Sequence, residues 1–89
     1  MAERTVTIGS KVGLHARPAA IFVKAAAQAA IPVTVRKDGG TPVNAASILA
    51  VMALGAKYQE SVTIAADGDG ADAVLDRLAE LLAKDLDAE

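Results

Sequence analysis

The sequence predicts an α+β fold: a four-stranded antiparallel sheet with three helices on one face, in the order βαββαβα. Three observations predict it. Short segments alternate apolar and polar residues, and alanine- and leucine-rich segments with helical spacing lie between them. Glycine or proline occurs where these segments meet. Because every predicted strand has one polar face, we expect one side of the sheet to be packed and the other to face water.

Three strands share a two-residue alternation that puts valine and isoleucine inward. They are Thr5–Ile8, Val33–Arg36 and Ser61–Ile64. A fourth strand, Thr41–Asn44, follows the Asp38-Gly39-Gly40 turn and should form a hairpin with the second. Pro42 cannot donate to a ladder, which places this strand at an edge. The side chains expected on the wet face are Thr5, Thr7, Thr34, Arg36, Ser61 and Thr63.

Helices are predicted between the strands. The first runs from Ala16 to about Ala29, with Ala19, Phe22, Ala26 and Ala29 on one face. The second runs from Ser47, as N-cap, to Leu54 before Gly55. The third runs from about Ala71 to Leu86 and buries Val74, Leu75, Leu78, Leu81 and Leu82. The first β-α-β crossover is expected to leave a gap that the Ser61–Ile64 strand fills.

Composition excludes several classes of protein. The 89 residues are expected to form one domain with a net charge of −2, no cysteine and one histidine. A nucleic-acid binder would need a basic surface and aromatic platforms, which this chain lacks. No run is long enough to span a membrane, and no signal-peptide pattern precedes the first strand. We expect a cytoplasmic protein that does not insert into membranes.

The only histidine lies at the predicted start of the first helix. Gly13 supplies a turn, Leu14 anchors it, His15 falls at or beside the N-cap, and Arg17 and Pro18 occupy the first turn. Proline is tolerated there because first-turn N–H groups have no intrahelical partner.

Free backbone donors, the positive end of the helix dipole and the Arg17 guanidinium together favour binding of an anion. The same positive surroundings should lower the pKa of His15 and keep its ring neutral and nucleophilic at pH 7. Phosphoryl transfer depends mainly on positioning and charge stabilisation, which these groups supply without a metal or cofactor. Alternatively, His15 is an exposed cap residue and Arg17 pairs with a carboxylate; these residues alone favour neither interpretation.

Other chemistries fit less well. A serine triad and a histidine metal site both need imidazoles that the chain lacks. A small ligand- or RNA-binding α+β module would carry aromatic residues on the wet sheet face. An independent enzyme would need an enclosed pocket around the histidine.

The segment Gly13–Ala20 resembles the active-site motif of the HPr family, the histidine-containing phosphocarriers of the bacterial phosphoenolpyruvate:sugar phosphotransferase system. A second segment, Asn44–Met52, and the order of elements extend the resemblance over essentially the whole chain. It implies an open-faced β-sandwich and a non-enzymatic carrier without cofactor. Phosphorylated enzyme I would phosphorylate His15 at Nδ1, and the IIA domain of a sugar permease would receive the group. Arg17 and the N–H groups of Ala16 and Arg17 would hold the phosphate.

The resemblance also implies a docking face. Its residues are Leu14, Ala20, Lys24, Ile48, Leu49 and Met52, although Ile48 and Met52 are equally compatible with a core role. Ser47 matches a serine that a regulatory kinase phosphorylates in part of the family. Ala46 replaces the basic or polar residue that normally precedes that serine, which weakens the case for a kinase here. Val12 replaces a small polar residue found in many relatives.

One alternative within the family is a regulatory or nitrogen-branch paralogue that acts mainly by binding partners. Paralogues that lost carrier function replace the histidine, so His15 favours the carrier. We expect a monomer. The sequence does not distinguish the sugar branch from the nitrogen branch.

Overall fold

The computed structural model describes residues 2–11, 13–14, 16–29, 31–37 and 39–84. Its elements follow the predicted order. They are β1 (Ala2–Thr7), α1 (Ala16–Ala27), β2 (Val33–Lys37), β3 (Val43–Asn44), α2 (Ile48–Ala53), β4 (Ser61–Ala66) and α3 (Ala71–Ala83).

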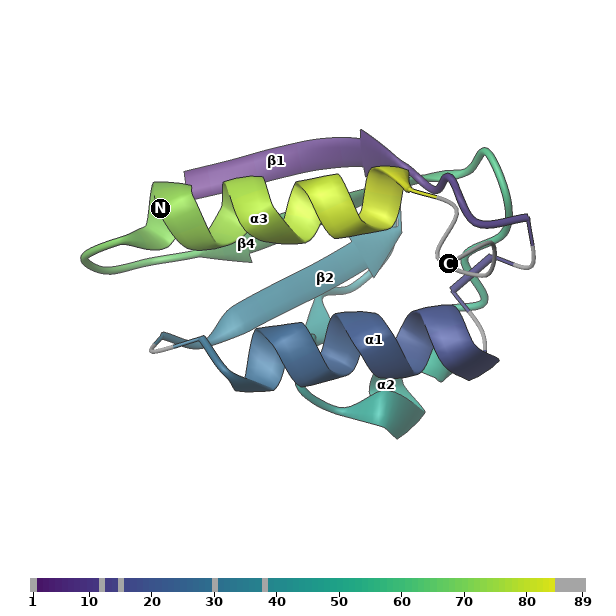
Figure 1. Cartoon of the computed structure of the whole chain (residues 1–89), viewed down its shortest axis with the longest axis horizontal. Coiled ribbons are helices and arrows are strands. Elements are labelled where there is room, and N and C mark those ends of the chain that lie inside the picture. Colours follow the sequence, from purple (N-terminus) through teal and green to yellow (C-terminus); the bar gives the residue numbers. More distant parts are fainter. Residues whose placement is uncertain (1, 12, 15, 30, 38, 85–89) are drawn as a thin grey trace.

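The strands form one antiparallel sheet in the order β1-β4-β2-β3. The last strand therefore fills the gap between the first two, as predicted, with Thr5 opposite Thr63 and Val35 opposite Ile64. The short β3 lies at the edge, and its two residues start after Pro42, which lies outside the strand. In Figure 1, α1 and α3 lie in front of the sheet and run in opposite directions, with α2 next to α1.

The core lies between the sheet and the helices. Phe22 of α1 is fully buried, as are Ile64 and Leu75. On β1, burial alternates residue by residue, with Val6 half-buried on the packed side and Ile8 buried just after the strand. This alternation confirms the inward face that the sequence predicted for the first strand.

Thr63 was predicted on the wet face and is instead buried, with 8% of its surface exposed. Its strand has β1 on one side and β2 on the other, so neighbouring side chains cover it. The hydroxyls of Thr63 and Thr5 are 3.0 Å apart and form a hydrogen bond across the two strands.

The third helix ends earlier than predicted. Lys84 leaves the helical conformation (φ −84°, ψ 154°), and the predicted end at Leu86 lies outside the described residues. The backbone N–H of Gly9 donates to the carbonyl oxygen of Leu82 at 2.9 Å, which satisfies one of the last carbonyls of α3. Of the predicted inward residues of α3, Val74 and Leu81 are only half-buried.

The first helix also ends earlier, at Ala27 rather than Ala29, followed by a tight turn in which the N–H of Ala29 donates to the Ala26 oxygen at 3.2 Å. Among the described residues, no helix combines the length and apolar character that a membrane span requires.

We predict that Gly9→Ala strongly destabilises the fold. A Cβ at Gly9 would lie 2.6 Å from the carbonyl carbon of Ala83 and closer still to its oxygen, so backbone must move. The expected loss in the free energy of unfolding is about 2 to 3 kcal/mol, as for severe overpacking. Urea unfolding measures it.

The matched control is Gly55→Ala, where φ is +65° but no atom of the described residues lies within 4 Å of the new Cβ. It should cost only roughly 1 kcal/mol, the penalty of a left-handed conformation. An equal or smaller loss for Gly9→Ala would contradict the close contact between the β1 end and α3.

Candidate functional site

The candidate site is the segment between β1 and α1, which the sequence centres on His15. His15 and Val12 lie outside the described residues. The structure therefore defines the site through the residues on either side of the histidine: Gly13 and Leu14 before it, and the first turn of α1 after it.

Gly13 makes a turn that other residues would not allow. Its φ is +74°, and a Cβ would lie 2.5 Å from the carbonyl oxygen of Ala56 and 2.9 Å from the Cα of Lys57. Its N–H donates to the Ser10 oxygen at 2.9 Å. Left-handed geometry and close backbone approach both require glycine here.

Leu14 anchors the chain immediately before the histidine. Its side chain is 2% exposed, and its N–H donates to the Ala56 oxygen at 2.8 Å. The predicted anchoring role is confirmed. The additional assignment of Leu14 to the docking face is wrong, because a side chain buried in the core cannot contact a partner.

Helix α1 begins at Ala16, so Ala16, Arg17 and Pro18 form its first turn, as predicted. Pro18 is fully buried and Arg17 is exposed. The first four N–H groups of a helix have no partner within it, and the dipole concentrates positive charge at the same end. This end of α1 can therefore attract and bind an anion.

A second segment, residues 56–60, holds the first in place. The N–H of Ile8 donates to the Glu60 oxygen at 2.9 Å, and the N–H of Gln59 donates to the Ile8 oxygen at 3.0 Å. Gln59 adopts a φ of 69°, rare for a residue with a side chain. These bonds attach the end of β1 to the chain before β4.

The carboxylate of Glu60 makes two polar contacts that stabilise this second segment. Its Oε1 accepts a hydrogen bond from the backbone N–H of Lys57 at 2.7 Å and lies 3.4 Å from the Nζ of Lys37. The backbone hydrogen bond, more than the nearby lysine charges, lowers the pKa of Glu60 below its ordinary value.

The remaining predicted docking residues lie on α1 and α2, which pack against each other. Ala20 and Lys24 of α1 are exposed. On α2, Leu49 is 80% exposed and Ile48 37%, whereas Met52 is half-buried. The structure thus leaves a large apolar side chain, Leu49, in water.

Ser47 caps α2. Its hydroxyl accepts a hydrogen bond from the N–H of Ala50 at 3.3 Å, which confirms the predicted N-cap. The preceding turn is held by Asn44, whose Oδ1 accepts from the N–H of Ala46 at 2.9 Å.

Sequence reasoning missed two residues near the site. Tyr58 is 44% exposed, and no apolar periodicity marks it because it lies in a loop. Ser10 is 3% exposed, and its hydroxyl has no hydrogen-bond partner among the residues that the structure describes. A lone serine in a loop gives no sequence signal of burial.

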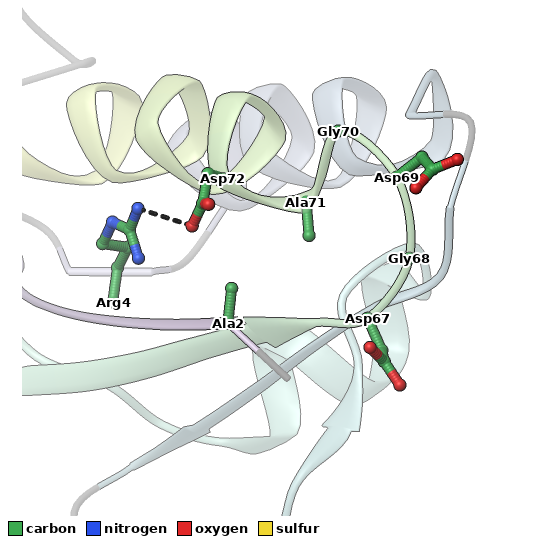
Figure 2. Close-up of a pocket in the computed structure, with 8 residues that line it drawn as sticks. All are labelled: Ala2, Arg4, Asp67, Gly68, Asp69, Gly70, Ala71 and Asp72. Atoms are coloured by element: carbon green, nitrogen blue, oxygen red, sulfur yellow. Dashed lines mark hydrogen bonds and ion pairs between the residues drawn. The ribbon is translucent and has the colours of Figure 1, made fainter.

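A separate hollow lies between the start of β1 and the loop before α3 (Figure 2). Asp72 points toward Arg4, and the two side chains form an ion pair at 3.0 Å, whereas Asp67 and Asp69 point away from them. Within the described ranges, no group of three acidic, histidine or cysteine side chains is arranged to bind a metal ion.

Comparison with known proteins identifies the family. The family model described as "PTS HPr component phosphorylation site" matches residues 2–84. The chain belongs to the HPr family. Phosphocarrier protein HPr of Streptomyces coelicolor is 55% identical over 87 residues, covering 98% of this chain and 94% of the relative. HPr-like protein Crh of Bacillus subtilis is 39% identical over 79 residues, covering 89% and 92%.

Solved HPr structures share the fold. HPr-C-His from Thermoanaerobacter tengcongensis superposes with a TM-score of 0.90 at 38% identity, covering 100% of this chain and 99% of that one. HPr from Bacillus anthracis gives 0.85 at 36% identity, covering 91% and 95%. The chain is an HPr-type phosphocarrier of the phosphotransferase system with the open-faced sandwich that the sequence predicted.

We predict that Glu60→Gln destabilises the protein in a pH-dependent way. Because folding lowers the pKa of Glu60, its stabilisation is present above the unfolded-state pKa and is lost as pH falls through the folded-state pKa. In urea unfolding the variant should be less stable than the native protein at about pH 7, and the difference should shrink as the pH is lowered to about 3.

Glu80→Gln, on the exposed surface of α3, is the matched control for removing a carboxylate. A loss of stability for Glu60→Gln that is the same at both pH values would show that the ionised carboxylate does not hold the segment.

Proposed function

We propose that this protein accepts a phosphoryl group on His15 from phosphorylated enzyme I and donates it to the IIA domain of a sugar permease. The observation that carries the proposal is the start of α1 at Ala16, directly after His15. The positive end of a helix dipole beside an imidazole disfavours the imidazolium form and attracts a phosphoryl group.

In this scheme the lone pair on Nδ1 of neutral His15 attacks phosphorus. The bond from phosphorus to enzyme I breaks, and its electrons stay with enzyme I. The N–H groups of Ala16 and Arg17 and the guanidinium of Arg17 stabilise the oxygens of the transferred group. The IIA domain then attacks the same phosphorus, and His15 leaves as neutral imidazole.

Such a protein is a covalent intermediate that is recharged in each cycle, not an enzyme, and the scheme uses no cofactor or metal. We propose that residues 1–89 act as one phosphocarrier domain, as a monomer, in the cytoplasm.

The docking face of this carrier would consist of Ala20 and Lys24 on α1 and Ile48, Leu49 and Met52 on α2. The exposure of Leu49 supports this docking face, because burying an apolar side chain against a partner lowers the free energy of the complex. Lys24 and Arg17 would steer acidic partner surfaces toward the histidine.

A regulatory or nitrogen-branch paralogue is the second candidate, and the match to HPr-like protein Crh is the observation in its favour. His15 favours the carrier function. Phosphorylation of Ser47 by a kinase would place negative charge at the start of α2, within the docking face. Ala46, which replaces the usual basic or polar residue, argues against this modification.

The test is phosphorylation from phosphoenolpyruvate by purified enzyme I. The native protein should acquire one acid-labile phosphate, and His15→Ala should acquire none. Arg17→Ala should be phosphorylated at the same position about tenfold more slowly. The rate falls because one group that stabilises the charge of the transferred phosphoryl group is lost, and the loss is smaller in an open site than in an enclosed one.

Arg36→Ala, at a half-buried position on the sheet, is the control for loss of a cation and should react at the native rate. Leu49→Ala should raise KM for the carrier and leave the phosphorylated position unchanged. Acid-labile phosphate on the His15→Ala variant would refute the proposed acceptor.

A further inference from the structure

A groove opens between α1 and α3, away from the proposed docking residues of α2. It consists of two adjoining hollows of about 230 and 300 Å³ that share Ala25, Gln28 and Arg77. The two helices run in opposite directions in front of the sheet (Figure 1). The groove therefore follows both helix axes.

The floor of the groove is apolar. Leu78 is buried at its base, and the other apolar residues that line it are half-buried: Ile21, Ala25, Ala29, Val74 and Leu81. The alanines of α1 are too short to reach across to α3, which explains the hollow. Half-buried apolar surface of this kind gains free energy when a partner covers it.

Each wall of the groove carries one cation. Lys24 projects from α1 and Arg77 from α3, both are exposed, and none of the described acidic residues lines either hollow. Among the described residues, neither cation has an ion-pair partner. The opposite flank of α3 differs, because Asp72 and Asp76 both bind Arg4 there.

We propose that this groove binds an acidic amphipathic helix of a protein partner. From Ile21 to Ala29 the groove spans about 12 Å, two helical turns, which accommodates anchors spaced i, i+4 and i+7. Carboxylates on both sides of the apolar stripe would meet Lys24 on one wall and Arg77 on the other. A small molecule is less well matched, because small-ligand sites enclose most of the ligand and these hollows are open to solvent.

The test uses a synthetic helical peptide with a leucine stripe flanked by glutamates, titrated into isotope-labelled full-length protein and followed by NMR. The amide signals of Ala25, Gln28, Val74 and Arg77 should shift, and binding should weaken with added salt. Arg77→Glu should weaken binding roughly three- to tenfold, because it replaces one attractive, exposed charge pair with a repulsive one. Arg36→Glu is the matched control and should bind as the native protein does.

Several results would overturn the proposal. They are no binding at millimolar peptide, equal binding of the same peptide with lysines in place of glutamates, shifts confined to Ile48 and Leu49, or tighter binding of octyl phosphate in the groove. The groove shares Lys24 with the proposed docking face, whereas Arg77 and the α3 side of the groove lie outside that face, so the two proposals can fail separately. The His15→Ala variant should bind the peptide normally, and Arg77→Glu should accept phosphate normally.

Discussion

The position of the candidate site depends on a few backbone hydrogen bonds between the segment after β1 and the segment before β4. Ile8 and Leu14 donate to Glu60 and Ala56, and Gln59 donates back to Ile8. These bonds join residues 42 to 52 positions apart in the chain, so they form only when β1 and β4 pair. The start of α1 is thereby fixed by the sheet and not by local sequence alone.

Buried and exposed side chains have different roles around this site. Leu14, Pro18 and Phe22 are buried and hold the segment and the first helix against the sheet. Among the described side chains left in water around the site are a cation, Arg17, and a large apolar group, Leu49. A rigid frame with an exposed, chemically mixed surface suits a carrier that binds one partner, releases it and binds another.

Much of this architecture was predictable because its causes are local. Alternation of valine and threonine defined the strands, Gly13 and Pro18 marked the start of α1, and Ser47 marked the cap of α2. The split order of the sheet followed from the rule that a crossover can leave room for a later strand.

Several of the errors concern contacts between distant parts of the chain. The sequence assigns Leu14 to both anchoring and docking, and only its burial in the folded chain, with its N–H bonded to the Ala56 oxygen, distinguishes the two roles. Thr63 is buried because its strand is central, and α3 ends early where Gly9 contacts it. The groove between α1 and α3 depends on which helix faces meet, which periodicity alone does not specify.

The central physical claim is that the positive end of α1 keeps the imidazole of His15 neutral at physiological pH. An NMR titration of the ring protons of His15 measures its pKa directly, with the urea-unfolded protein as the reference. We predict that the folded-state pKa lies below both the unfolded value and the ordinary value of about 6.5. A folded-state pKa above the unfolded value would contradict this claim, because the ring would then be stabilised in its protonated, non-nucleophilic form.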